Sequence, residues 1–415
     1  MTLLSETSFL VTPNGYKASK LYAAIPTNGN GDMTVTRATT ATRVDENDLV
    51  SSVASNIPRI DYTGGGCPSI LLEPQRTNLF TYSEQFDNVA WSKTASTVEA
   101  NSTTSPSGVI NADTHIPNTT NNYHHISQVR AVTSGVSYSF SIYAKAAGYN
   151  FLLINTISGS SSGNVGPLFD LSNGTLIGSL GGNNYNAKIT SVGNSWYRID
   201  FSYITNAVTT RIDINLFPTS TIATYSGNGT SGIYLWGAQL EAGAYATSYI
   251  PTVASTVTRN ADVITKTGIS DLINSEEGVL FFEGSALIEE GAFSRLISIS
   301  SGSNNDRFYF YYSADGKFGF ASFVGGVLQA NITYDGIIAN NSKVACKYKE
   351  NDYALWVDGV EVGTDISASV WSSGTLDTLN FADANGGSYF FYGKVKQLQV
   401  YKTALTDTQL AALTT

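Results

Sequence analysis

Hydrophobic and polar residues alternate with a period of two along much of the chain after residue 79. In SYSFSIYAKA, Tyr138, Phe140 and Ile142 alternate with three serines, which is the pattern of a strand with one buried face. The runs YHHISQVRAV, SWYRIDFSYI and GIYLWGAQLE have the same character, and Gly-, Asn- and Ser-rich loops separate them. Short strands at this spacing predict a two-sheet, jelly-roll sandwich over residues 79–255.

A second block of strand patterns fills residues 256–415. RFYFYYSADGKFGFASF and YALWVDGVEVGT each predict a hairpin, because Asp-Gly supplies the positive φ angles of a tight turn at Asp315–Gly316 and at Asp358–Gly359. Alternation along the first hairpin predicts two faces, one formed by Phe308, Phe310 and Tyr312 and the other by Tyr309 and Tyr311. The block therefore predicts a second β-sandwich.

The chain closes with a predicted strand, KQLQVY, and then a short helix. Val395 falls out of step with the strand alternation, which indicates a bulge or the start of the strand. Thr406 is the expected helix N-cap and Gln409, three residues later, its capping-box partner. Leu405 and Leu410 are placed to form the hydrophobic staple around this helix start.

Residues 1–78 have no long alternating run. A segment of this kind can hardly bury a core of its own, so we expect it to be irregular and to wrap on a neighbouring domain, a subunit or a larger assembly. The predicted organisation is thus an all-β chain in three parts: an N-terminal anchoring segment (1–78) and two tandem sandwiches (79–255 and 256–415).

The composition agrees with this fold class and argues against nucleic acid and membrane as binding partners. Only 13% of the 415 residues are charged, whereas 38 Gly, 24 Tyr and 19 Phe favour strands and turns. A formal net charge of -10 argues against nucleic acid, which requires a basic surface. No stretch of about 18 apolar residues occurs, so membrane insertion is not expected.

The last block resembles the laminin G-like, concanavalin A-like sandwich family. NDYALWVDGVEVG is similar to the strand-Asp-Gly-strand hairpin of that family, FFYGKVKQLQVY to its penultimate strand, and KTALTDTQLAAL to its closing helix. The resemblance covers about 150 residues and implies the fold rather than a ligand, since such sandwiches serve as lectins, adhesion modules, glycanases and spacers.

The upstream block resembles the carbohydrate-binding-module-like jelly rolls of tailed-phage fibre and other virion proteins. The similarity lies in NLFTYSEQFDNVAWSK, VTSGVSYSFSIYAKA, NSWYRIDFSY, YLWGAQLEAG and TSYIPTVASTVTRNAD. RATTATRVDENDLV, PRIDY and LLEPQRTN are similar to the entry segment of the same phage group.

This resemblance implies a phage virion structural protein of fibre, spike or decoration type. Such a protein would be made in the host cytoplasm, reside on the particle surface and form a homotrimer. Its N-terminal segment would contact other virion proteins, and its sandwiches would adhere to host surface glycan. A purely structural capsid decoration or head-fibre protein without glycan binding is the alternative, and a polysaccharide depolymerase is a second one.

A structural calcium is the only cofactor for which the sequence offers candidates. Jelly-roll modules often hold one through oxygen ligands of the first and last strands, and Glu84 and Glu241 are the candidate ligands. The last strand, however, has Gly237 and Ala238 where an acidic pair would be expected. With three His, two distant Cys and no EF-hand spacing, no other metal site is predicted.

No catalytic constellation is visible, so we expect the protein not to be an enzyme. Glycoside hydrolysis needs two carboxylates across one cleft. The pairs Glu276–Glu277 and Glu289–Glu290 are sequence neighbours and would point to opposite faces of a strand. His124 and His125 have no nucleophile motif beside them and are expected to be structural.

Sugar binding calls for exposed aromatic rings beside polar loops. Trp371, in the polar stretch SASVWSSGTLD, is the strongest candidate, and Tyr309, Tyr311 and Tyr334 could join it unless their faces are covered. The remaining tryptophans lie in strand patterns or resemble packing residues, and are expected to be buried: Trp91, Trp196, Trp236 and Trp356.

Overall fold

The structure is a computed structural model that describes residues 3–158, 166–180, 185–221, 224–287, 295–312, 317–337 and 341–415. Strands dominate, and α1 (Asp407–Thr414) is the one α-helix among these residues, beside two 3-10 helices at Leu3–Glu6 and Ser270–Leu272. The predicted all-β class is confirmed. Within the described ranges, no helix is long and apolar enough to cross a membrane.

The chain divides into two compact units. Unit 1 comprises Met1–Thr40, Val53–Pro74 and Asn260–Thr415, and unit 2 comprises Ala41–Ser52 and Gln75–Arg259. The N-terminal residues are thus shared between the units rather than forming a third body.

In unit 1 the strands form one continuous antiparallel path, and its end strands β27 and β30 lie against each other, so the sheet folds over a common core. In path order the strands are β27 (Val327–Ile337), β26 (Lys317–Val324), β25 (Arg307–Tyr312), β24 (Arg295–Ser300), β31 (Thr378–Asn380), β22 (Val263–Lys266), β3 (Met33–Thr36), β2 (Lys20–Ile25), β1 (Thr7–Lys17), β32 (Gly393–Tyr401), β23 (Glu277–Ala286), β28 (Ser342–Lys349), β29 (Tyr353–Val357) and β30 (Val360–Asp365). Off this path, β6 (Ile60–Asp61) pairs with β7 (Ser69–Leu72), which pairs with β32.

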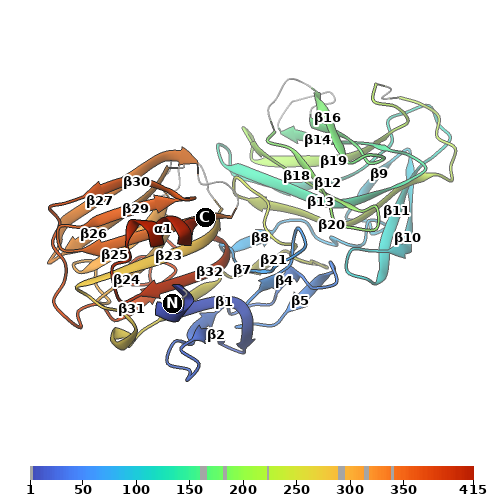
Figure 1. Ribbon diagram of the computed structural model, residues 1–415. Helices are drawn as coiled ribbons and strands as arrows, with labels where there is room; N and C mark the ends of the chain where they lie inside the picture. Colours follow the sequence, from blue (N-terminus) through green and yellow to red (C-terminus); the bar gives the residue numbers. More distant parts are fainter. Residues whose placement is uncertain are drawn as a thin grey trace. The chain divides into compact units, whose positions relative to one another are not determined.

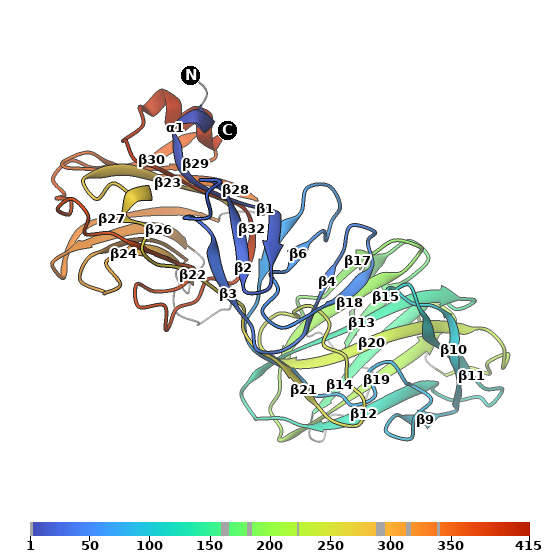
Figure 2. The same cartoon turned by 90° about the horizontal axis from the view of Figure 1, so that it is seen from below.

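The N-terminal segment differs from the irregular segment expected. Its strand β1 pairs with the last strand of the chain, so that Thr7 lies opposite Tyr401 and Val11 opposite Leu398. Figure 1 shows this as blue β1 beside red β32, and Figure 2 shows the same neighbours from below. The segment therefore completes the sheet of unit 1, because it finds its strand partners at the far end of the sequence.

Alternation along β25 is confirmed. Phe308, Phe310 and Tyr312 are buried in the core of unit 1, whereas Tyr309 and Tyr311 are half-buried on the opposite face. The hairpin turn at Asp358–Gly359 has φ angles of 46° and 85°, as a primed turn requires. The turn predicted at Asp315–Gly316 lies outside the described residues.

The closing strand and helix are as predicted. β32 has a register shift between its pairs Glu283–Gln397 and Gly284–Val395, which places a bulge beside Val395. Thr406 caps α1 with a complete capping box to Gln409. Leu405 and Leu410 are buried in a small cluster on the outer side of β23, β28 and β29.

Unit 2 is a two-sheet sandwich around its own core, as the strand spacing predicts. One sheet has the order β10 (Ser96–Thr104), β11 (Ile110–Pro117), β20 (Gly232–Ala242), β13 (Ser137–Ala147), β18 (Tyr197–Ile204) and β17 (Lys188–Ser191). The other has the order β16 (Thr175–Leu180), β15 (Gly166–Asp170), β14 (Phe151–Ser158), β19 (Thr209–Phe217), β12 (His125–Ala131) and β9 (Ser92–Thr94). Two short pairs complete the unit: β8 (Arg76–Asn78) with β21 (Val257–Arg259), and β4 (Ala41–Val44) with β5 (Val50–Val53).

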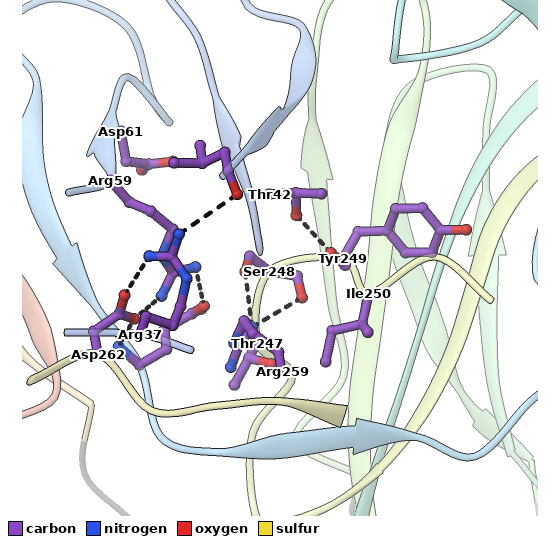
Figure 3. Close-up of polar contacts among 12 residues, drawn as sticks. Arg37, Thr42, Arg59, Asp61, Thr247, Ser248, Tyr249, Ile250, Arg259 and Asp262 are labelled. Atoms are coloured by element: carbon purple, nitrogen blue, oxygen red, sulfur yellow. Dashed lines mark hydrogen bonds and ion pairs between the residues drawn. The ribbon is translucent and has the colours of Figure 1, made fainter. Parts of the chain in front are cut away.

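The polar face of β13 is also covered. An aromatic cluster of Tyr143, Trp196, Trp236 and Tyr249 lies there, and Val50 of β5 packs against it. Thr42 Oγ1 donates a 2.5 Å hydrogen bond to the Tyr249 carbonyl, which holds the β4–β5 hairpin in place (Figure 3). Trp196 and Trp236 are therefore buried, as expected, and so are Trp91 and Trp356.

Four charged residues from distant motifs meet inside unit 1: Arg37, Arg59, Glu73 and Asp262. Figure 3 labels Arg37, Arg59 and Asp262 of this group. Asp262 accepts hydrogen bonds from Arg37 (2.9 Å), from Arg59 and from the Glu73 backbone N–H (2.9 Å). Arg59 also pairs with Glu73 at 2.6 Å, and all four side chains are at most 5% exposed. These residues come from the motifs VTRATT, PRIDY, LLEPQ and TRNAD, so the polar stretches that interrupt the strand pattern supply a buried ionic network.

Candidate functional site

A pocket of about 260 Å³ lies in unit 1, where β24 and β25 meet the loop after β31. Its lining residues are Leu296, Asn304, Arg307, Tyr309, Asp383, Ala384 and Tyr389. Arg307 and Tyr309 are two positions apart on β25, so their side chains share the face of the strand that points away from the core. The strand pattern RFYFYY thus places a cation and an aromatic ring side by side.

Aromatic rings hold the guanidinium of Arg307. Its Cζ lies 5.1 Å from the Tyr309 ring centroid and 4.6 Å from that of Phe323, its cross-strand partner on β26. The Tyr309 and Phe323 rings are themselves nearly parallel, at 11°. Cation–π attraction of this kind orients the guanidinium without neutralising it.

The loop of residues 383–389 also lines the pocket, and hydrogen bonds within this loop fix its conformation. The Asp383 carboxylate accepts hydrogen bonds from Gly387 N (2.9 Å), Ser388 N (3.2 Å) and Ser388 Oγ (2.7 Å). Tyr389, at the end of this loop, has a φ of 51° and is 45% exposed. Its carbonyl accepts a 2.9 Å hydrogen bond from Leu296 N, which ties the loop to β24.

Trp371 cannot take the part proposed for it from the sequence. The side chain is 2% exposed, and its ring lies 5.6 Å from Phe308 and 5.9 Å from Tyr348 between ring centroids. Its Nε1 donates a 2.8 Å hydrogen bond to the Phe323 carbonyl. The polar neighbours of Trp371 in the sequence suggested exposure, but the loop folds the ring into the core, where no sugar reaches it.

The three candidate tyrosines separate into different places. Tyr309 lines the pocket, whereas Tyr311 lies on the same strand face with its hydroxyl 2.9 Å from Asn331 Oδ1. Tyr334 lies opposite Phe318 and packs against the core of unit 1, on the other face of the sheet. Of the four predicted contacts, only Tyr309 lines this pocket.

The sequence alone did not predict three residues of the pocket: Arg307, Asn304 and Tyr389. Arg307 could have been found as the residue two before Tyr309 in RFYFYY, on the same face of a predicted strand. Tyr389 follows the turn signal NGG and is therefore placed at a loop end. The sequence does not show that β25 and a loop some 80 residues later lie side by side and line the same pocket.

The two calcium candidates have protein partners. Glu84 accepts hydrogen bonds from Asn111 Nδ2 (2.8 Å) and Tyr249 Oη (3.0 Å), and burial raises the pKa of its carboxyl. Glu241 is fully buried and accepts from the Thr247 backbone N–H (2.9 Å) and hydroxyl (2.5 Å). The described residues contain no group of three or more His, Cys, Asp or Glu side chains that could hold a metal.

The two glutamate pairs that the sequence analysis rejected as catalytic pairs are described only in part. Glu276 is exposed, and Glu277 at the start of β23 lies 3.6 Å from Lys349 Nζ. Glu289 and Glu290 lie outside the described residues. The expectation that the protein is not an enzyme stays a prediction.

Three histidines lie close together in unit 2: His115 near the end of β11, and His124 and His125 at the start of β12. His124 is buried, with Nδ1 2.5 Å from the Ala95 carbonyl and Nε2 2.8 Å from the Tyr225 carbonyl. His115 is buried beside the Ser96 hydroxyl, at 2.9 Å. These hydrogen bonds connect a loop with neighbouring strands, so His115 and His124 have a structural role.

Acid should destabilise unit 2 through His115. Burial, with smaller contributions from His125 and His124, lowers its pKa from 6.5 to about 3. Between those pH values the unfolded chain binds a proton that the folded chain does not, so stability is full above pH 6.5 and falls as the pH drops toward 3. Between pH 6.5 and 4.5 this amounts to about 2–3 kcal/mol.

We expect His115→Gln to flatten the dependence of the melting temperature of unit 2 on pH between 7.5 and 4.5, as measured by calorimetry. The wild-type protein at each pH is the reference, since the variant also changes packing at every pH. An equally steep dependence in the variant would contradict this role of His115.

The comparisons with known proteins bear on the fold of this chain. A search of curated proteins finds no match. Among solved structures, the CBM40 domain of the Ruminococcus gnavus IT-sialidase bound to alpha2,3 sialyllactose is 23% identical, covering 34% of this chain and 82% of that one, with a TM-score of 0.29. Domain 4 of the extracellular arabinanase AbnA of Geobacillus stearothermophilus is 14% identical, covering 41% and 83%, with a TM-score of 0.29.

Mouse laminin alpha1 chain domains LG4-5 are 14% identical and cover 69% of this chain and 90% of that one, with a TM-score of 0.22. None of these TM-scores is high enough to carry an argument about function. The family model is more specific, because it matches a defined stretch of the sequence. Residues 288–411, which contain every residue of the pocket, match the model of the concanavalin A-like lectin/glucanases superfamily, and the C-terminal part of the chain thus has a lectin-like β-sandwich fold.

Proposed function

We propose that this protein binds glycans and that the pocket between β25 and the 383–389 loop is the binding site. The observation that carries the proposal is the grouping of Tyr309, Tyr389 and Arg307 around one pocket of a concanavalin A-like sandwich. Aromatic rings stack on the apolar faces of pyranoses, while polar groups bind the hydroxyls. The side-chain amide of Asn304, which also lines the pocket, supplies both a donor and an acceptor.

Removing the rings tests the site. Tyr309→Ala and Tyr389→Ala should each weaken binding to a responsive glycan roughly 10-fold or more, because buried tyrosine contacts dominate such interfaces. The measurement is a glycan array on the full-length protein, followed by calorimetric titration of the best glycan. Binding is measured with calcium and with EDTA, since the proposed contacts require no metal.

Tyr311→Ala is the matched control. Tyr311 lies on the same face of β25, 5.9 Å from Tyr309 between ring centroids, but does not line the pocket. A loss in Tyr311→Ala equal to that in Tyr309→Ala would indicate a general effect on β25. A glycan bound with undiminished affinity by Tyr309→Ala and Tyr389→Ala would move the site elsewhere.

We further propose the setting in which this binding operates: a phage virion surface protein that adheres to host glycan without cleaving it. Support comes from the resemblance of RATTATRVDENDLV, PRIDY and the upstream strand motifs to tailed-phage virion proteins. Assembly as a homotrimer on other virion proteins would multiply weak contacts into high avidity. A protein that binds no glycan or host cell would favour the capsid-decoration alternative, and release of reducing ends from host polysaccharide would favour the depolymerase.

A further inference from the structure

We propose that the pocket selects saccharides that carry a carboxylate, with Arg307 as the residue that determines this specificity. The inference deepens the proposed function and rests on it, since it names the class of sugar that the same pocket takes.

Arg307 is the only cation among the described residues that line the pocket. No ion pair joins it to a carboxylate in the part of the chain that the structure describes, and within that part its buried Nε has no hydrogen-bond partner. A buried or half-buried guanidinium ordinarily has such a partner, because leaving its charge uncompensated is costly. An anionic ligand would supply the missing compensation.

Two carboxylates lie near this site in the sequence or the fold, and both accept backbone hydrogen bonds. Asp383 accepts three hydrogen bonds from Gly387 and Ser388, as described above. Asp306, beside Arg307 in the sequence, accepts a 2.8 Å hydrogen bond from Gly325 N. These contacts engage both carboxylates and leave the Arg307 guanidinium as the charged group for a ligand.

The geometry favours a carboxylate on a ring of sugar size. A guanidinium presents a planar fork of N–H donors that matches a carboxylate in two parallel hydrogen bonds. Tyr309 beside it, and Tyr389 across the pocket, can contact the apolar face of the same sugar. A volume of about 260 Å³ lies just below the usual range for small-molecule pockets, which suits one terminal acidic sugar rather than a long chain.

Paired probes that differ in one acidic group test the inference. Titration calorimetry on the full-length protein would compare 3′-sialyllactose with lactose, and a glucuronic acid-terminated disaccharide with its glucose-terminated counterpart. In at least one pair we expect the acidic sugar to bind roughly 10-fold tighter than its neutral counterpart, or better, because a charge-assisted hydrogen bond is worth about this much. Arg307→Gln should abolish that difference, and Arg307→Lys should restore only part of it, since an ammonium cannot form the fork.

Lys317→Gln is the matched control for charge. Lys317 lies on β26, six positions from the Phe323 that pairs with Arg307, which is about 20 Å along the strand. Its removal changes the net charge by the same amount and should leave the preference intact. Should Arg307→Gln fail to fold, the methyl ester of 3′-sialyllactose asks the same question of the wild-type protein, because it removes only the negative charge of the ligand.

The possible outcomes separate the two proposals. Neutral and acidic sugars bound equally well at the pocket would overturn the carboxylate preference and leave glycan binding standing. An acidic sugar bound equally by wild type and Arg307→Gln, or a sulfated galactoside bound as tightly as the carboxylated probes, would also overturn it. Failure to bind any glycan would remove the proposed function and this inference together.

Discussion

Asp262→Ala should lower the stability of unit 1 by about 3–5 kcal/mol, the usual cost of removing one partner from a buried ionic network. Asp262 is 3% exposed and compensates two guanidinium groups, those of Arg37 and Arg59, that are not exposed at all. Burial by itself would lower the pKa of Arg59, but the charges of Asp262 and Glu73 outweigh it and raise that pKa. An arginine guanidinium does not lose its proton in proteins, so both arginines remain charged when Asp262 is removed, while Glu73 remains as the partner of Arg59.

Denaturant unfolding followed by hydrogen exchange would measure this loss, since exchange assigns the destabilised strands to unit 1 and the two units need not unfold together. Asp335→Asn is the matched control, because Asp335 is 86% exposed and pairs with Lys317 at the surface. That variant should change stability by less than about 1 kcal/mol. A similarly small effect of Asp262→Ala would mean that the network contributes little to the fold.

Features set by neighbouring residues could be predicted from the sequence. The two faces of β25, the turn at Asp358–Gly359 and the capping box of Thr406 each depend on residues within a few positions of one another. Alternation, turn chemistry and capping are local properties, so one sequence suffices to read them.

Features set by distant partners could not be predicted in the same way. The N-terminal residues show no strand pattern of their own, and β1 is a strand because β32 lies beside it, as the pair Thr7–Tyr401 shows. The ionic network brings Arg37 to Asp262 in the same manner. In both cases the residues are visible in the sequence, but no local pattern shows which distant residues pair with each other.

The candidate site combines both kinds of feature. Tyr309 could be placed on the outer face of β25 because alternation decides it, and it lines the pocket. The loop carrying Asp383 and Tyr389 joins it through pairing with Leu296, which no local pattern indicates. Local composition was misleading for Trp371, because Ser and Gly neighbours describe its loop and not the core that receives its ring.

Trp371→Ala should consequently destabilise unit 1 by about 3–5 kcal/mol, as the loss of a large buried ring does. The substitution would leave a cavity beside Phe308 and Tyr348 and deprive the Phe323 carbonyl of its 2.8 Å hydrogen bond. The Phe323 ring in turn lies against the guanidinium of Arg307, so Trp371 is linked to this pocket residue through Phe323. The loss should appear as a lower denaturant midpoint for unit 1.

Trp371→Phe separates packing from direct contact, because it keeps most of the ring and loses only volume and the N–H donor. We expect it to lose less stability than the alanine variant and, well below its melting temperature, to bind glycan close to wild type. A Trp371→Ala variant that kept the wild-type midpoint but lost glycan binding would show the opposite. It would mean that the loop of Trp371 opens in solution and presents the ring to the sugar, which the 2% exposure of Trp371 and its ring contacts with Phe308 and Tyr348 argue against.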